Sequence, residues 1–251
     1  MISVVLINFN EASKLERCFE SLAGFADEIV VLDIGSSDQS MDVCKKYGAR
    51  VFKHDFVPYV EKVRNYAISK TTGDWILVLD PDETVPDKLK DELRQISAED
   101  KYAAVNIPRK NIFFGKWIAH TNWWPDRHVR FFKKGKVSWS NKIHQYPEVS
   151  GPILTLEARE ELAIAHFGYD TVSEFINRQN RYSVIEAENL YSEGISFSWD
   201  MFFWKPLREF LVRFLRHGGF LDGFYGFALT VLIMVYQLEV MIKLWELEQK
   251  K

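Results

Sequence analysis

The sequence predicts an α/β protein built on a largely parallel sheet. Three observations support this fold class. β-branched apolar runs alternate with segments of helical apolar spacing, which is typical of strands joined by helical crossovers. The connections between them are short and polar. Acidic residues end two of the apolar runs, at Asp33 and Asp80, and ligands of open α/β sheets bind beyond the carboxyl ends of the strands. The sequence therefore also predicts which edge of the sheet carries a ligand.

The elements follow in chain order. Residues 3–7 form an apolar, β-branched run that predicts the first strand. The helix after it presents one apolar face at Leu15, Cys18, Phe19 and Leu22. The strand–helix unit then repeats, and right-handed crossovers are expected to join the parallel strands. Strands are predicted at 29–33, 50–54 and 75–80, and helices at 41–47 and 60–68.

The fourth predicted strand ends in Asp80-Pro81-Asp82-Glu83. If the chain stays extended there, the carboxylates of Asp80 and Asp82 point to the same side and can share one hard cation. The alternative is a simple turn that closes the strand, because Pro and Asp both favour turns.

Further polar motifs accompany these elements: Asn10-Glu11 after the first strand, residues 33–38 after the second, Arg64-Asn65 in the 60–68 helix, and residues 73–75 before the fourth strand. In this order the motifs resemble glycosyltransferase family 2, whose members have the GT-A fold. Within that family the chain is most similar to bacterial lipopolysaccharide-core and capsule glucosyltransferases. The resemblance implies a GT-A catalytic domain over 1–169, with a donor half at 1–100 and an acceptor half at 101–169. It rests on residues 10–11, 33–38, 64–65, 73–75 and 80–83, and within the branch on 130–132, Trp139 with His144, and 219–223.

The resemblance implies a donor site for a UDP-sugar. Asn10, Glu11 and Asp33 would contact the nucleoside, and Asp80 and Asp82 would hold Mg²⁺ or Mn²⁺ against the diphosphate. Asn10 and Glu11 have an alternative role, which is to cap the helix that follows.

Arg64 would assist Asp80 at the same diphosphate. Its alternative role is that of a solvated residue on the surface of a helix.

A general base must take the proton from the acceptor hydroxyl. Relatives commonly show His-Glu where this chain has His144-Gln145, and a glutamine cannot accept that proton. Asp126 is the preferred replacement because it is the only acid between residues 109 and 142, and Glu148 is the second candidate.

The alternative role of Asp126 is an ion pair with Arg127 or Arg130. Its segment, 109–142, contains nine Lys or Arg residues and four Trp. We interpret this mixture as an acceptor groove, in which Arg130, Trp139 and His144 contact the acceptor or a phosphate. A nucleic-acid surface is disfavoured because the net charge is −3 and the pI about 6.1. A plain aromatic core with solvated lysines is the remaining alternative.

The chain becomes helical after about residue 170. A capping box is predicted at 171–174, and helix boundaries near Gly194 and Ser198. In the following segment Lys205, Arg208, Arg213 and Arg216 alternate with aromatic and aliphatic residues, a pattern typical of helices that lie in an anionic membrane surface. The uncharged run 223–238 is shorter than the ~20 residues that span a bilayer. We therefore expect 170–251 to associate with the inner leaflet through 200–240 or to form a homo-oligomer.

The sequence favours a metal-dependent, inverting glycosyltransferase that moves a hexose, with glucose expected, from a UDP-sugar to a cell-envelope glycan or glycolipid. Transfer to a polyprenyl phosphate is the enzymatic alternative, because that acceptor is already ionised and needs no base. A non-catalytic carbohydrate- or membrane-binding module on a GT-A scaffold is the alternative of another class. The chain has two cysteines, Cys18 and Cys44, both in predicted helices, which predicts a reduced, cytoplasmic protein. The segment 200–240 would place it at the periphery of the cytoplasmic membrane.

Overall fold

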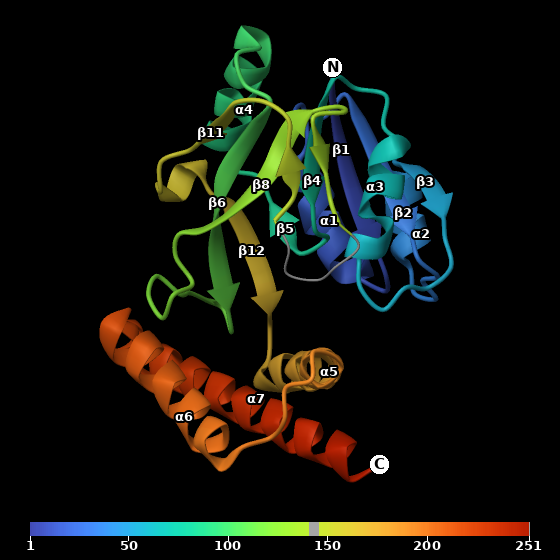
Figure 1. Cartoon of the computed structure of the whole chain (residues 1–251). Coiled ribbons are helices and arrows are strands. Elements are labelled where there is room, and N and C mark those ends of the chain that lie inside the picture. Colours follow the sequence, from blue (N-terminus) through green and yellow to red (C-terminus); the bar gives the residue numbers. More distant parts are fainter. Residues whose placement is uncertain (141–145, 251) are drawn as a thin grey trace. The chain divides into compact units, whose positions relative to one another are not determined.

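The structure is a computed structural model that describes residues 1–140 and 146–250 (Figure 1). The chain forms two compact units. The α/β unit comprises Met1–Arg109 and Arg127–His166, and the helical unit comprises Lys110–Asp126 and Phe167–Lys251. The division differs from the expected boundary at 169/170, because the segment 110–126 belongs with the C-terminal helices.

Four parallel strands form the first half of the sheet, in the order β3-β2-β1-β4. The strands and crossover helices confirm the predicted elements to within one or two residues at each end. They are β1 (Ile2–Asn8), α1 (Ala12–Ser21), β2 (Glu28–Asp33), α2 (Ser40–Lys46), β3 (Arg50–Lys53), α3 (Glu61–Ser69) and β4 (Trp75–Leu79).

The second half of the sheet is mixed. β8 (Asp126–Lys133) runs antiparallel to β4, and the order continues through β6 (Ala104–Phe113) and β12 (Ile164–Tyr169) to β5 (Glu83–Thr84). β7 and β11 add to β6, while β9 and β10 form a separate two-stranded sheet. These remaining elements are α4 (Asp87–Glu99), β7 (Lys116–Trp117), β9 (Val137–Ser138), β10 (Glu148–Val149), β11 (Ile153–Thr155) and the 3₁₀ turn η1 (Glu160–Leu162).

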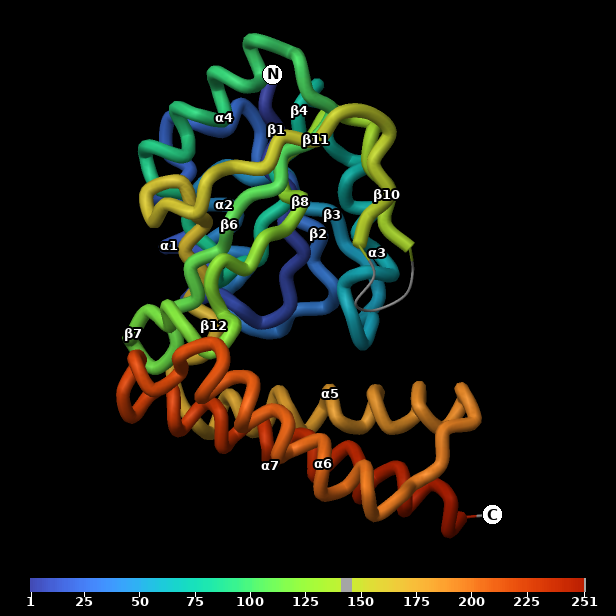
Figure 2. Tube along the Cα trace, turned by 60° about the vertical axis from the view of Figure 1, so that its left-hand side comes forward, coloured from blue at the N-terminus to red at the C-terminus, as the bar shows by residue number. Residues whose placement is uncertain are grey.

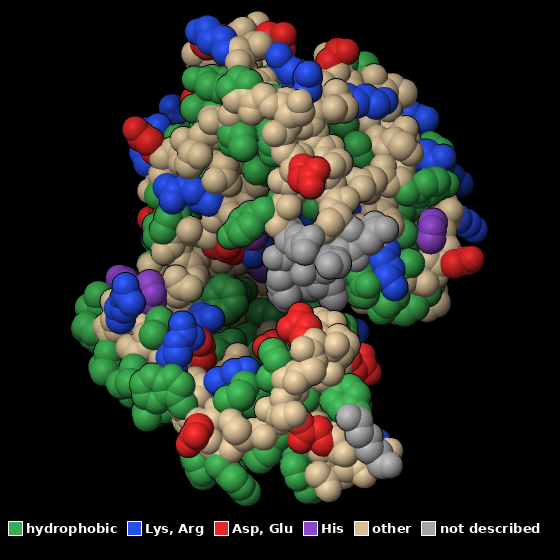
Figure 3. All heavy atoms as spheres, viewed as in Figure 1, with side chains coloured by type: hydrophobic (Ala, Val, Ile, Leu, Met, Phe, Trp, Pro, Cys, Tyr) green, Lys and Arg blue, Asp and Glu red, His purple; other side chains and the backbone are tan. Residues whose placement is uncertain are grey.

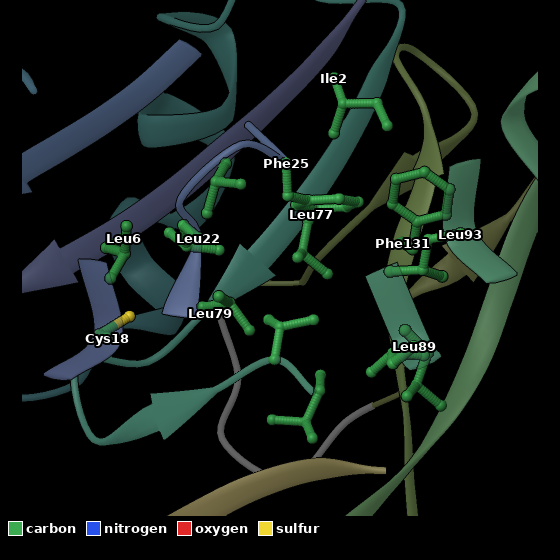
Figure 4. Packing of buried hydrophobic residues seen from close by; sticks show 14 of the residues in the cluster. Ile2, Leu6, Cys18, Leu22, Phe25, Leu77, Leu79, Leu89, Leu93 and Phe131 are labelled. Atoms are coloured by element: carbon green, nitrogen blue, oxygen red, sulfur yellow. The ribbon is translucent and has the colours of Figure 1, made fainter. Parts of the chain in front are cut away.

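Alternating side chains of the sheet fill two cores, one on each face. Leu6 and Leu77 pack with α1, α2 and α4 on one face, whereas Val5 and Ile76 pack with α3 on the other. Figure 2 shows α3 and α4 on opposite sides of the strands, and Figure 4 shows the first core, in which Cys18 lies beside Leu6 and Leu22. Successive side chains of a strand point to opposite faces of the sheet. Both faces are therefore apolar here, because helices cover both of them.

Cys18 and Cys44 are both buried and free. Burial raises the pKa of both thiols, that of Cys44 to about 11. The two cysteines are therefore protonated packing residues, as the sequence predicted.

The helical unit contains three long helices. Thr171 Oγ1 accepts a hydrogen bond from Glu174 N, and Ser198 Oγ accepts one from Met201 N, so both predicted N-caps are confirmed. Gly194 ends the first helix with a positive φ of 76°. The elements are α5 (Val172–Ser192), α6 (Trp199–Phe210), the π-helical η2 (Leu211–Arg216), the 3₁₀ turn η3 (Gly219–Asp222) and α7 (Phe224–Gln249).

α7 is longer than the uncharged run 223–238, because it continues through Glu239 and Lys243 to Gln249. In the described part of the chain it is the one helix whose length and composition would allow it to cross a membrane. One side of α7 is buried, with Leu229 and Ile233 packed in the same cluster as Phe113 and Phe175, which explains why the segment 110–126 joins this unit.

The segment 219–223 has a structural role in the helical unit. A Cβ on Gly226 of α7 would lie 1.9 Å from the carbonyl oxygen of Gly219, so the two backbones approach as closely as glycine allows. Asp222 is buried and accepts hydrogen bonds from the backbone N–H groups of Ala119 and His120. This family-like motif therefore attaches the segment 110–126 to α7.

Candidate donor site

The carboxyl ends of β1 and β2 meet in one hydrogen-bonded layer. Asn8 Nδ2 donates to Asp33 Oδ1 at 3.2 Å and to Ser36 Oγ at 3.0 Å. Asp33 Oδ2 accepts from the backbone N–H groups of Gly35 and Ser36, at 3.2 and 3.1 Å. Asn8 and Asp33 are register partners and both are buried. Asp33 therefore sets the shape of the loop that follows β2, as expected of an Asx turn.

Asn10 joins the two loops from the other side. Its Oδ1 accepts from Ser37 N at 2.7 Å, and its backbone adopts a positive φ of 55°, a conformation that Asn tolerates. Asp38 Oδ2 in turn accepts from Ala12 N, the first residue of α1. Desolvation opposes ionisation of Asp38, but its hydrogen bonds keep the pKa of this carboxyl lowered.

The capping alternative for the residues before α1 is therefore wrong in detail. Glu11 occupies the N-cap position without a side-chain cap and forms an ion pair with Lys14 at 3.2 Å, while the cap of Ala12 comes from the neighbouring loop. Glu11 and Asn10 remain proposals as nucleoside contacts.

The motif after β4 forms a turn. Glu83 N donates to Asp80 O at 3.0 Å, and Glu83 Oε2 accepts from Asp80 N at 2.9 Å. The turn, one of the two conformations considered for this motif, is therefore the one that forms, because the i to i+3 hydrogen bond reverses the chain at Pro81 and Asp82. A turn is compatible with a ligand site at this motif, because the buried Glu83 anchors the segment that carries Asp80 and Asp82.

Arginines from two strands neutralise the acids of this turn. Arg130 Nη2 on β8 donates to Asp80 Oδ2 at 2.8 Å and to Glu83 Oε1 at 3.0 Å. Arg109 Nη1 on β6 lies 3.5 Å from the same Glu83 oxygen. Burial alone would raise the pKa of Asp80, but Arg130, Arg64 and Arg109 lower it well below its usual range. Asp80 is therefore a carboxylate at neutral pH.

Arg64 lies on α3 and is mostly withdrawn from solvent. Its guanidinium stacks on Trp139 at 5.6 Å from the ring centroid. Burial lowers the pKa of Arg64, and Asp80 partly offsets this effect. Its Nε is buried without a hydrogen-bond partner among the described residues. A solvated surface role for Arg64 is therefore incorrect.

Trp139 supports Arg64 rather than presenting a sugar-binding face. The residue is 7% exposed, its ring packs on Phe132, and its backbone N–H and C=O are both held by the Asn65 amide. The expected acceptor contact of Trp139 is thus not favoured, because a ring inside the core cannot stack on a sugar.

Asp82 is buried, and its Oδ2 lies 3.5 Å from His166 Nε2 on β12. No group of three or more His, Cys, Asp or Glu side chains that could hold a metal occurs among residues 1–140 and 146–250. Mg²⁺ needs only one or two protein carboxylates when phosphate oxygens and water complete its shell. The donor set of Asp80 and Asp82, both oxygen ligands on one anchored turn, fits such a cation.

The base candidates differ in their surroundings. Asp126 begins β8 and accepts a hydrogen bond from the buried Asn111 amide at 3.2 Å. Strand alternation places Asp126 and Arg130, four residues apart, on the same face of β8. Glu148 is exposed on the short strand β10 opposite Ser138. His144 lies outside the described residues.

Three residues of this cluster were not predicted from the sequence, namely Glu83 as an anchor, Arg109 and His166. The signals in the sequence are the third acid of the 80–83 motif and polar residues within apolar strands. The pairing of β5 with β12 brings His166 opposite Glu83. Such pairing between distant segments is not encoded in local periodicity.

Comparison with known proteins places these motifs in a family. An uncharacterized glycosyltransferase of Rickettsia typhi is 27% identical, over 99% of this chain and 88% of the relative. The lipopolysaccharide core biosynthesis glycosyltransferase LpsC of Rhizobium meliloti is 24% identical, over 98% of this chain and 92% of LpsC. The crystal structure of S. aureus TarS matches with a TM-score of 0.49 and 17% identity, over 74% of this chain and 39% of TarS.

The family model described as glycosyl transferase family 2 matches residues 3–150. This match spans more than half of the chain and includes every motif on which the resemblance to the family rested within the first 150 residues. It confirms that resemblance, and together with the α/β architecture it confirms the predicted GT-A fold class. The chain therefore belongs to glycosyl transferase family 2.

Proposed function

We propose that this glycosyltransferase is a metal-dependent, inverting enzyme that transfers a hexose from a UDP-sugar to a cell-envelope glycan or glycolipid. UDP-glucose is the expected donor. The observation that carries the proposal is the cluster beyond β4, in which an ionised Asp80 contacts Arg130 while Arg64 and Arg109 lower its pKa. A site with both carboxylates and guanidinium groups is suited to a divalent cation and a diphosphate together.

The donor would be held by the loops after β1 and β2 and by arginines of α3 and β8. The loops after β1 and β2, which Asn10 and Asp33 shape, would accommodate the nucleoside. Arg64 and Arg130 would donate to the diphosphate, because guanidinium groups bind phosphate oxygens with two parallel hydrogen bonds. The carboxyl ends of the parallel strands β1, β2 and β4 meet at one sheet edge. Arg130 of the antiparallel β8 reaches the same edge through its hydrogen bond to Asp80.

Asp80 and Asp82 would hold Mg²⁺ or Mn²⁺. When bound, the cation neutralises negative charge on the departing diphosphate. Glu83 keeps the turn in place through Asp80 N and Arg130, and Arg130 reduces the repulsion among the three acids of the turn. The residues of this chain therefore provide an ionised Asp80 and an Asp82 anchored on the same turn, and both would face the donor phosphates.

In the proposed reaction the acceptor hydroxyl oxygen bonds to the anomeric carbon as the bond from that carbon to the diphosphate oxygen breaks. The acceptor proton passes to Asp126, and UDP leaves. A single displacement of this kind inverts the anomeric centre. Asn111 donates to Asp126 and would orient its carboxylate.

The similarity to LpsC supports an acceptor in the lipopolysaccharide core. An enzyme with such an acceptor is expected to work at the cytoplasmic face of the membrane. Transfer to a polyprenyl phosphate would use the same donor groups but not Asp126, since the acceptor phosphate is already an anion.

The first experiment is calorimetric titration of UDP and UDP-glucose, with and without Mn²⁺, on the wild type and on Asp82→Asn. We expect Mn²⁺-dependent binding by the wild type. Loss of a direct ligand should weaken it at least as much as the roughly 10- to 100-fold that results from altering outer partners of a metal.

The matched control is Asp87→Asn, five positions further along the chain. The Asp87 side chain is 92% exposed, and its described ion pair is with Lys90, three residues later. The control should bind UDP like the wild type. Binding that is equally strong with and without Mn²⁺, or unchanged in Asp82→Asn, would contradict the metal assignment. No binding to any variant would favour a non-catalytic module on the same scaffold.

A further inference from the structure

We propose that the helical unit binds the surface of an anionic lipid bilayer through one aromatic face. This aromatic face is formed by α6, η2, η3 and the first turn of α7. It is independent of the donor chemistry, so it can be tested without a substrate. Its most exposed apolar residues are Trp199 (66%), Phe203 (66%), Trp204 (56%), Phe220 (53%), Leu221 (62%) and Phe224 (78%).

Ring contacts run from the end of α6 through η2 and η3 to the start of α7. Phe210 stacks on Phe214 at 5.2 Å between ring centroids, and Phe214 contacts Phe220 and Phe227 at 6.3 and 5.8 Å. Phe227 contacts Phe224 at 6.5 Å. The aromatic rings thus connect α6 and η2 to η3 and α7, and an apolar patch made from several elements exceeds the scattered exposure of ordinary surfaces.

The spacing along α6 and η2 explains why these residues face outward. Phe203, Leu207, Leu211 and Leu215 recur every four positions and form a stripe, while Pro206 on another side is buried. The packed side of α6 contacts α7, with Met201 and Phe202 beside the buried Val240 and Leu244. One side of α6 therefore packs on α7. A second apolar side has no protein partner among the described residues of the unit.

Positive charge accompanies this face. Arg208 and Arg216 are exposed next to Leu207 and Leu215, and Lys205 is half-buried beside Trp204. Figure 3 shows hydrophobic (green) and Lys or Arg (blue) side chains together over the helices that Figure 1 labels α6 and α7.

The acids of the same segment are mostly engaged within the protein. Glu209 holds Arg213 at 2.8 Å and contacts Arg208 at 3.1 Å, and Asp222 is buried against backbone N–H groups. Asp200 is the exposed acid, and it lies at the N-terminal end of α6. The accessible charge around the aromatic face is therefore basic and complements anionic headgroups.

A bilayer fits this face better than a second copy of the chain. A two-fold dimer through the same patch would bury the exposed Arg208 and Arg216 of both copies, and taking these charges out of water is costly. At a membrane surface the same arginines meet lipid phosphates, and tryptophan rings are favoured at the headgroup level.

The test is co-sedimentation of the full chain with vesicles of phosphatidylcholine alone and of phosphatidylcholine mixed with phosphatidylglycerol. We expect binding to the anionic vesicles that weakens as salt rises. Phe203→Ser/Trp204→Ser should lower the partition coefficient at least about tenfold, because the variant loses two aromatic rings that the bilayer would cover. Arg208→Glu/Arg216→Glu should lower the partition coefficient by roughly 25-fold or more. Each basic residue near an anionic surface contributes about fivefold, and the variant loses two of them.

Matched controls separate the face from general effects. Ile176→Ser/Val184→Ser removes two exposed apolar residues of α5, and Lys45→Glu/Lys88→Glu reverses two exposed lysines of the α/β unit. Both controls should retain vesicle binding, and all variants should retain the wild-type circular dichroism spectrum.

Vesicle binding that is equal in the face variants and the controls would overturn the proposal. A stable dimer that does not bind vesicles, detected by light scattering and lost in Phe203→Ser/Trp204→Ser, would overturn it in favour of a second copy. Because no nucleotide is present in the assay, its failure is distinguishable from failure of the donor-site proposal.

Discussion

Replacing Arg130 by glutamine should destabilise the α/β unit, because this arginine is shared by two carboxylates. Its Nη2 lies 2.8 Å from Asp80 Oδ2 and 3.0 Å from Glu83 Oε1. Arg130 is buried and Glu83 is 0% exposed, so Glu83 cannot regain water when the cation is removed. The variant Arg130→Gln would leave Arg109, at 3.5 Å, as the remaining described cation on that oxygen.

The magnitude follows from burial. Removing one partner of a buried ion pair typically costs about 3–5 kcal/mol. We expect about 3 kcal/mol here, at the lower end, because Arg109 stays near Glu83 and because the Asp80 side chain is 35% exposed and partly screened by solvent.

The effect should depend on pH through Asp80. The pKa of Asp80 in the folded protein is lowered below its unfolded value, mainly by Arg130 against the opposing effect of burial. This carboxylate therefore contributes stability above its unfolded pKa of about 4, and the contribution is lost as the pH falls toward the lower folded pKa. The difference between wild type and Arg130→Gln should accordingly be greatest near neutral pH and should shrink as the pH is lowered below about 4.

The assay is urea unfolding followed by tryptophan fluorescence at several pH values, on single variants and on Arg130→Gln/Asp80→Asn. The control is Arg127→Gln, three residues earlier on the same strand, whose Nε is buried without a described hydrogen-bond partner. Arg127→Gln should cost less than about 1 kcal/mol, and the Arg130–Asp80 cycle should show a coupling of about 1–3 kcal/mol. Equal stability of the two arginine variants, or zero coupling, would refute the assigned network.

Two further predictions concern catalysis and the helical unit. Asp126→Asn should lower kcat for a hydroxyl acceptor by roughly 10²- to 10⁴-fold while leaving UDP binding unchanged, measured by sugar transfer and by calorimetry; undiminished kcat would instead indicate another base or an acceptor phosphate. Gly226→Ala should destabilise the helical unit by about 1–3 kcal/mol or more, because the new Cβ would lie 1.9 Å from Gly219 O. Urea unfolding followed by circular dichroism checks this, and an unchanged transition would show that the close approach of η3 and α7 relaxes without cost.

The first hundred residues were predictable because their signals are local. Strand and helix periodicities located β1 to β4 and α1 to α3. Further along the chain, local signals of the same kind at Thr171 and Ser198 located the starts of α5 and α6. Each of these signals comes from residues within a few positions of one another. The acids at the ends of β2 and β4 were also visible, since parallel strands bring their carboxyl ends to one edge.

Prediction was weaker where a side chain's role depends on distant segments. Trp139 was expected at an acceptor, yet its ring packs on Phe132 and supports Arg64 from a position 75 residues away. The sequence left open whether Asp80 and Asp82 lie on an extended chain or in a turn, and the structure has a turn anchored through Glu83. The spacing of apolar residues predicts neither the packing of Trp139 nor the anchoring of the turn, because both depend on which segments become neighbours in the fold.

The sequence by itself determined the alternation of strands and helices, the family, and the identity of the acids at the ligand edge. Tertiary structure decided which charges meet: Arg130 reaches Glu83 across 47 residues, and His120 reaches Asp222 across 102. It also decided that residues 110–126 belong with the helical unit. The physical reason is that periodicity and capping are short-range, whereas ion pairs and burial are set by sheet order and helix packing between residues far apart in the chain.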